Sequence, residues 1–99
     1  MERLPFEVGR VVRSMQGRDE GRFFLIVQVL DEQYVQIADG CCHKLDHPKK
    51  KKLKHLRAKP LLMQALQEQN RKPKLLDSDL RSFLEEAGLG MNQPVYKEG

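Results

Sequence analysis

Residues 23–38 read FFLIVQVLDEQYVQIA, and this stretch decides the fold class. Its first part, residues 23–30, is rich in aromatic and β-branched side chains, which is typical of a mostly buried strand. A short polar turn at residues 31–33 follows, and residues 34–38 then alternate apolar with polar side chains. The pattern predicts a β-hairpin whose second strand ends at residues 39–40, Asp-Gly.

Two further strands are predicted on either side of this hairpin. Residues 6–15 loosely alternate apolar and polar side chains, with a glycine-associated kink. Residues 51–56, KKLKHL, predict a short strand whose exposed positions are basic. Between the first strand and the hairpin, residues 16–22 read QGRDEGR, in which Gly17 and Gly21 bracket a charged turn and are free to adopt positive φ.

Several short strands without an intervening helix indicate a mainly β unit. A strand set of this length favours a small barrel, in which pairing of the first and last strands removes exposed sheet edges. We therefore expect a β-barrel in residues 1–59.

The hydrophobic period changes after residue 60. Residues 61–69, LLMQALQEQ, carry apolar side chains at helical spacing and predict a short amphipathic helix. A second helix is predicted with Ser78 as its cap, Asp79 in its first turn and Gly88 at its end. Its apolar face is formed by Leu80, Phe83, Leu84 and Ala87. Residues 60–99 are thus expected to form a helical extension with a frayed tail.

The positive charge is concentrated in one segment. Residues 43–59 carry seven Lys and one Arg against a single Asp, whereas the segments before and after them are slightly acidic, in a chain of net charge +4. Such clustering favours a nucleic-acid partner, because Lys and Arg that neutralise phosphates release condensed counterions. The alternative is a solvated edge strand on which lysines discourage aggregation.

Two stretches carry a resemblance to a known family. Residues 8–40 resemble a KOW motif, which consists of a strand, a glycine-containing charged turn and an apolar strand. Residues 49–58, KKKKLKHLRA, resemble the basic segment of KOW-type large-subunit ribosomal proteins of archaea and eukaryotes, the group called fourteen-e, and of small bacterial homologues. The resemblance covers about residues 6–58, and it implies an SH3-like β-barrel that binds RNA.

The resemblance also identifies the central glycine of the motif as Gly21. Many KOW motifs have a basic residue immediately before that glycine, whereas this chain has Glu20. This departure weakens the turn itself as a phosphate contact, although Arg18 and Arg22 flank it. For both of these arginines we favour contact with a partner.

The basic segment supplies most of the candidate binding residues. We expect Lys50, Lys52 and Lys54 to project from one side of a strand, with Leu53 packing on the other. Arg10 and Arg13 either bind phosphate or pair with nearby acids across strands, and the two readings stay open. His55 either touches phosphate or packs at the barrel rim. The predicted RNA-binding residues are Arg18, Arg22, Lys49, Lys50, Lys51, Lys52, Lys54, His55, Arg57 and Lys59, with Gly17 and Gly21 as structural glycines.

Other chemistries find little support in the sequence. Cys41 and Cys42 are adjacent, which does not suit a disulfide framework and fits a reducing compartment. With His43 and His47 they lack the spacing of a zinc site, so no metal or cofactor is expected. Tyr34 could stack on a base, but half-burial in the barrel is favoured. There is no signal-peptide core and no apolar run near the roughly 18 residues of a membrane span, so a cytoplasmic protein is expected.

The sequence thus predicts a non-enzymatic RNA-binding protein, associated with the ribosome or another structured RNA and monomeric when free. An alternative belongs to another class. The chain could be a protein-interaction module that binds ribosomal or transcription proteins through the barrel or the helical tail. The apolar residues of that tail are Leu61, Leu62, Leu66, Leu80, Phe83 and Leu84.

Overall fold

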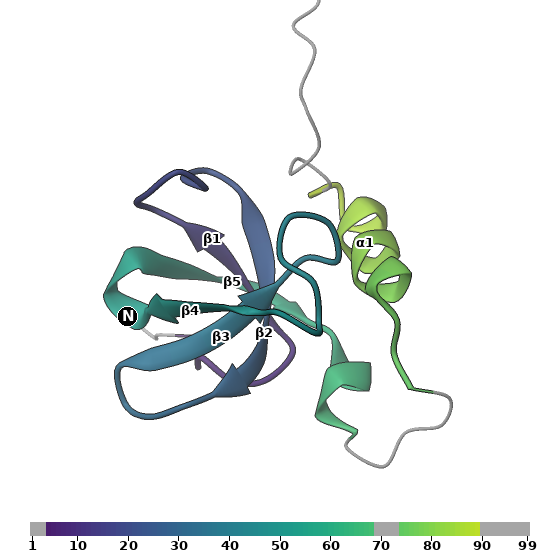
Figure 1. The fold of residues 1–99 in the computed structure, drawn as a ribbon, viewed down its shortest axis with the longest axis horizontal. Coiled ribbons are helices and arrows are strands. Elements are labelled where there is room, and N and C mark those ends of the chain that lie inside the picture. Colours follow the sequence, from purple (N-terminus) through teal and green to yellow (C-terminus); the bar gives the residue numbers. More distant parts are fainter. Residues whose placement is uncertain (1–3, 69–73, 90–99) are drawn as a thin grey trace, which may run out of the picture.

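The computed structural model describes residues 4–68 and 74–89, which form a five-stranded antiparallel sheet with one α-helix packed against it (Figure 1). The strands are β1 (Arg10–Ser14), β2 (Phe23–Val29), β3 (Tyr34–Ala38), β4 (Lys49–Lys52) and β5 (Leu56–Leu62). The helices are the 3-10 turns η1 (Leu53–His55) and η2 (Gln64–Gln67) and the α-helix α1 (Asp77–Glu86). The mainly β class and the hairpin of β2 and β3 are confirmed.

The sheet is open but strongly curled. Its strand order is β4-β3-β2-β1-β5, so β4 and β5 are the two edges, and no ladder joins them in the described residues. Only the three residues of η1 connect these edge strands. The edges of a flat five-stranded sheet would lie about 19 Å apart, whereas a 3-10 turn advances about 2 Å per residue. The sheet must therefore bend until its edges approach each other (Figure 1).

The basic strand predicted over residues 51–56 is wrong in its extent. β4 ends at Lys52, the chain turns through η1, and β5 begins at Leu56. The N–H of Leu53 donates a hydrogen bond of 2.8 Å to the carbonyl of Gln33, in the loop between β2 and β3. This tertiary bond fixes the turn at a position where the sequence alternates as a strand would.

The helix predicted over residues 61–69 is also wrong. Leu61 and Leu62 complete β5, and only the short turn η2 follows; residue 69 lies outside the described residues. The backbone explains the difference, because the N–H of Met63 donates to the carbonyl of Gly9 at 2.7 Å, beside β1. Pairing with β1 thus carries β5 past residue 59, the predicted end of the barrel.

The second predicted helix is confirmed as α1, although its cap differs. Leu76, not Ser78, occupies the N-cap position, and the Asp79 carboxylate accepts the Leu76 N–H at 2.8 Å. Gly88 follows the helix with a φ of 77°, as predicted. The predicted fraying of residues 89–99 falls almost entirely outside the described residues. No helix in the described ranges is long and apolar enough to cross a membrane.

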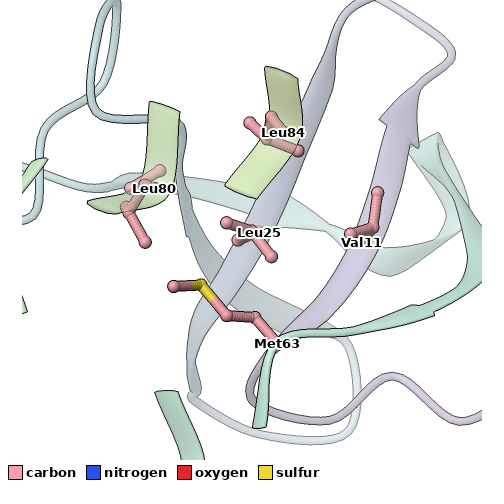
Figure 2. Close-up of a cluster of buried hydrophobic side chains, with 6 residues drawn as sticks. Val11, Leu25, Met63, Leu80 and Leu84 are labelled. Carbon is pink, nitrogen blue, oxygen red and sulfur yellow. The ribbon is translucent and has the colours of Figure 1, made fainter. Parts of the chain in front are cut away.

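Two apolar clusters lie on the two faces of the curled sheet. The inner cluster consists of Val12, Phe24, Ile26, Val35, Ile37 and Leu56. The outer cluster consists of Val11, Leu25, Ala38, Met63, Leu80 and Leu84, and most of these are labelled in Figure 2. Neighbours such as Val11 and Val12 belong to different clusters because side chains alternate across a strand. The apolar face of α1 therefore covers part of the outer surface of β1 and β2.

Polar contacts fix α1 against the loop that links β3 to β4 (Figure 1). The Asp77 carboxylate accepts the N–H of Leu45 at 2.8 Å, and the Arg81 guanidinium donates to the carbonyl of Gly40. Gly40 has a φ of 79°, and a Cβ at this position would lie 2.1 Å from the Asp77 carbonyl oxygen. A glycine is thus required for the loop and the helix to approach so closely.

Replacement of this glycine tests the docking of α1. Gly40→Ala should destabilise the fold by more than about 1 kcal/mol, since it adds a backbone clash to the cost of a left-handed alanine. Gly88→Ala is the matched control, because Gly88 has a φ of 77° and nothing within 4 Å of the added Cβ. Urea unfolding of both variants should show the larger loss for Gly40→Ala. Equal losses would contradict a tight contact between this loop and α1.

Candidate nucleic-acid interface

The turn between β1 and β2 is closed by its own backbone. The N–H of Gly21 donates to the Ser14 carbonyl at 2.7 Å, and the N–H of Glu20 donates to the Gly17 carbonyl at 3.2 Å. Gly17 and Gly21 have φ values of 93° and 87°, as the sequence predicts. These bonds direct the side chain of Asp19 toward the sheet.

Asp19 ties this turn to the basic strand β4. Its side chain is buried, and its Oδ1 atom accepts hydrogen bonds from the Ser14 hydroxyl at 2.8 Å and from Lys51 Nζ at 3.1 Å. Lys49 Nζ lies 3.3 Å from the other carboxylate oxygen. Lys51 Nζ also donates to the carbonyl of Gln16 at 2.9 Å, so one ammonium contacts the turn twice.

This environment determines the ionisation of Asp19. Burial by itself would raise the pKa of the carboxyl, but the hydrogen bonds from Ser14 and Lys51 and the charges of Lys51 and Lys49 outweigh it. The pKa is lowered from 3.8 to about 2. The ring of His43 completes the surroundings, with its Nε2 atom 4.0 Å from the carboxylate. Asp19 is therefore a charged, fully engaged group near neutral pH.

The four lysines of β4 divide between two faces. Lys49 and Lys51 face Asp19, and the side chain of Lys51 is only 8% exposed. Lys50 and Lys52 lie on the opposite face, where their Nζ atoms are 4.5 and 5.7 Å from the centroid of the Tyr34 ring. Alternation along the strand produces this division. Tyr34 is half-buried, and two lysines lie over its ring.

The predicted ridge of Lys50, Lys52 and Lys54 on one strand is wrong for its last member. Lys54 lies in η1, exposed, next to the half-buried His55. Leu53 lies in the same turn rather than in a strand, and its half-buried side chain packs against the inner cluster, as the sequence predicts. The ridge is therefore short, and its continuation passes through a turn into β5.

Arg13 and Arg57 form a second pair of cations. They are partners in the β1–β5 ladder, and both are exposed. In the described residues, neither guanidinium has a hydrogen bond or ion pair with another side chain. The sequence predicts RNA contact for Arg57 and leaves both readings open for Arg13. Arg13 lies between buried Val12 and Ser14, and this alternation places it on the outer face of β1.

The sequence leaves open whether Arg10 binds phosphate or pairs with nearby acids. In the structure, Arg10 pairs within the fold. It is 8% exposed, and its guanidinium donates to the Glu7 carboxylate at 2.9 Å and to the Pro5 carbonyl at 2.9 Å. It also donates to the carbonyl of Lys59 at 3.2 Å, on β5. Arg10 therefore ties the N-terminal segment to the edge of the sheet, and the half-buried side chain of Lys59 lies nearby on that edge.

The remaining predicted residues lie in the turn and the loop beside it. Arg18 is exposed, and Arg22 donates to the sulfur of Cys42 at 3.0 Å. Burial and the charge of Asp39 raise the pKa of the Cys42 thiol, so the sulfur stays protonated near neutral pH. Among the residues that the structure describes, no three His, Cys, Asp or Glu side chains are grouped so that they could hold a metal ion.

Within the part of the chain that the structure describes, the outer surface thus presents cations that form no ion pair with another side chain. Lys50 and Lys52 project from β4, and Arg13 and Arg57 project from β1 and β5, which η1 connects to β4. Such an array suits an extended anion that carries several charges. No protein-family model matches this chain, and a search of curated proteins finds no match.

The link between Asp19 and β4 predicts a specific dependence of stability on pH. Because the pKa of Asp19 is depressed, its contribution is complete above 3.8 and is lost as the pH falls toward 2. The contribution is on the order of 2 kcal/mol. In urea unfolding from pH 6 to pH 2, the stability difference between the wild type and Asp19→Asn should shrink as both approach pH 2. Asp46→Asn, which removes an exposed loop carboxylate, should parallel the wild type. A constant difference for Asp19→Asn would refute the assignment.

Neighbouring lysines of β4 should respond differently to the same change. Lys51→Met leaves the buried Asp19 carboxylate short of a donor and should cost about 1–3 kcal/mol of unfolding free energy. Lys50→Met keeps the stem of the side chain on the exposed face and loses only the cation–π contact with Tyr34, so it should cost less than Lys51→Met, at most about 0.5–1 kcal/mol. Thermal unfolding of the two variants measures the loss of stability in each. Equal destabilisation would show that the two faces of β4 are not distinct.

Proposed function

We propose that this protein is a non-enzymatic, cytoplasmic RNA-binding protein that contacts the phosphates of a structured RNA, such as ribosomal RNA, through the outer cations of β1, β4 and β5. The observation that carries the proposal is the direct pairing of exposed Arg13 with exposed Arg57 in the β1–β5 ladder. Like charges directly opposite each other on neighbouring strands destabilise a sheet. A bound polyanion converts this cost into attraction.

Phosphate explains the choice of residue type at this pair. A guanidinium presents a planar fork of donors that matches phosphate oxygens in a bidentate arrangement. Placement on neighbouring strands fixes the two guanidinium stems before binding, so less ordering is needed when the RNA arrives. Arg13 and Arg57 therefore provide a preorganised contact for adjacent phosphates.

The second pair extends the contact surface along the curled sheet. Lys50 and Lys52 lie on the outer face of β4, and Tyr34 supports both ammonium groups by cation–π contact. The β4 strand leads through η1 into β5, where Arg57 follows. Phosphate contacts of this kind position a protein on RNA but carry no sequence information.

The resemblance to KOW proteins belongs to the same proposal. In support of an SH3-like arrangement, the strand order places β1 between β2 and β5, and a 3-10 turn joins the two edge strands. The positive φ values of Gly17 and Gly21 agree with a KOW-type turn. The proposal follows the ribosomal KOW group in its choice of a structured RNA as partner.

The protein-docking alternative loses part of its basis. It relied on the apolar residues of the helical tail, but Leu80 and Leu84 are 0% and 2% exposed and pack on Val11 and Leu25 (Figure 2). A partner could reach these leucines only if α1 left the sheet. No observation on the described residues favours docking over RNA binding.

Salt-dependent binding provides the test. The purified protein should bind folded ribosomal RNA more tightly than duplex DNA of matched length, with affinity that falls steeply from about 50 to 200 mM salt. Arg13→Gln and Arg57→Gln should each weaken RNA binding and reduce the slope of log K against log salt by about 1. The double variant Lys50→Gln/Lys52→Gln should reduce the slope by about 2.

Lys74→Gln is the matched control, because Lys74 is exposed and lies just before α1, outside the three strands. Its slope should stay close to that of the wild type. Equal binding of RNA and DNA would reduce the cations to a nonspecific electrostatic surface. A slope that falls equally for Lys74→Gln and the strand variants would refute this interface, and absence of binding at low salt would refute the function.

A further inference from the structure

A depression lies beside the outer cations and has a different chemical character. It has a volume of about 380 Å³, within the range of pockets for small organic groups. It lies between η1 and the loop that joins β2 to β3, and it opens to solvent. Its lining residues are Glu32, Gln33, Lys52, Leu53 and Lys54.

The two walls of this depression are held in a fixed relation. The Asp31 carboxylate accepts the N–H groups of Gln33 and Tyr34 at 2.7 and 2.8 Å, which shapes the loop. The Gln33 carbonyl then accepts the N–H of Leu53 at 2.8 Å, which joins the loop to η1. A ligand would therefore meet a preorganised surface rather than two independent loops.

The lining combines groups that recognise both parts of a nucleotide. Lys52 and Lys54 supply ammonium groups for flanking phosphates, and Leu53 supplies an apolar surface for a base. Glu32 and Gln33 are exposed, and their side chains make no hydrogen bond or ion pair within the described residues. They are available to read the edge of a base.

Glu32 is the informative member of the set. A carboxylate repels phosphate, so a surface that contacted only phosphates would be weakened by its presence. A carboxylate is an acceptor-only group that can receive two parallel hydrogen bonds. The presence of Glu32 among lysines is explained if its carboxylate accepts hydrogen bonds from a base while the lysines bind the RNA phosphates on either side of that base.

On this basis we propose that the depression binds one unpaired nucleotide of the RNA and prefers guanine. The Watson–Crick edge of guanine offers two adjacent donors, N1–H and the 2-amino group, which match the two oxygens of Glu32. Adenine, cytosine and uracil each present an acceptor beside their donor on that edge, so they leave one carboxylate oxygen facing an acceptor. This inference rests on the proposed function, and it adds the sequence preference that phosphate contacts do not supply.

Short labelled RNAs test the preference directly. Fluorescence anisotropy compares hexauridylate with variants that carry one central guanine, adenine, cytosine or inosine, at about 50 mM salt. The guanine oligonucleotide should bind about tenfold more tightly than the others. Inosine lacks the 2-amino group and should lose most of this advantage. Amide chemical shifts of Gln33 and Leu53 should move on addition of the guanine oligonucleotide.

The substitution Glu32→Gln replaces one acceptor oxygen with a donor and keeps the size of the side chain. It should abolish the guanine preference while hexauridylate binds as well as before or slightly better. Glu86→Gln is the matched control, because it removes the same charge from an exposed position on α1, and it should retain the preference.

The outcomes separate the two proposals. Salt-dependent binding of all the oligonucleotides with equal affinity would overturn the guanine site and leave the phosphate interface standing. A guanine preference that survives Glu32→Gln, or that Glu86→Gln removes equally, would also overturn the site. Absence of binding to any RNA, folded or short, would overturn the proposed function together with it.

Discussion

The ion pair between Asp19 and Lys51 is the interaction on which the arrangement of the outer surface depends. β4 is an edge strand, and among the described residues it has a ladder partner only on its β3 side. The carboxylate of Asp19 supplies its second attachment, through Lys51 at 3.1 Å and Lys49 at 3.3 Å. Because these two lysines face inward, the period of the strand turns Lys50 and Lys52 outward. One buried acid thereby sets the position of the turn and the orientation of the basic strand.

The run of four lysines therefore has two functions, which four identical residues in a row do not reveal. Lys49 and Lys51 share one carboxylate within the fold, so the buried Lys51 does not reach a partner, and Lys49, whose side chain is 37% exposed, reaches one only in part. Buried Arg10 is likewise engaged, with Glu7 and two backbone carbonyls. The surface that faces a partner is built from fewer cations than the sequence suggests. Their positions on rigid strands, and not their number, distinguish it from a charged tail.

Features encoded by local sequence were predictable. The hairpin of β2 and β3 follows from its side-chain pattern, Gly17 and Gly21 from turn chemistry, and α1 from its apolar period. Features that depend on distant partners were not. The alternation at residues 51–56 gives no sign that the Gln33 carbonyl would fix a turn at Leu53. Apolar spacing after residue 60 suits a helix equally well, and only the pairing with β1 makes Leu61 and Leu62 part of a strand.

The candidate site shows the same division. Lys50, Lys52 and Arg57 could be selected from the sequence because a dense basic segment is a local signal. Arg13 could not be selected, since its importance comes from its ladder partner Arg57, which lies on another strand. In the sequence, Asp19 is one of several charged residues in a polar turn. Its burial depends on lysines about thirty residues away in the sequence.

The helical extension and the proposed interface are parts of one surface. Along β1, Val11 lies beneath α1 in the outer cluster, whereas Arg13, on the same face two residues later, is exposed. The outer face of this strand therefore changes from covered to open between these two residues. α1 protects the apolar half from solvent and leaves the cationic half free. Since Leu80 and Leu84 maintain that coverage, the helix determines how far the binding surface extends, and a separate function for it would expose Val11 and Leu25.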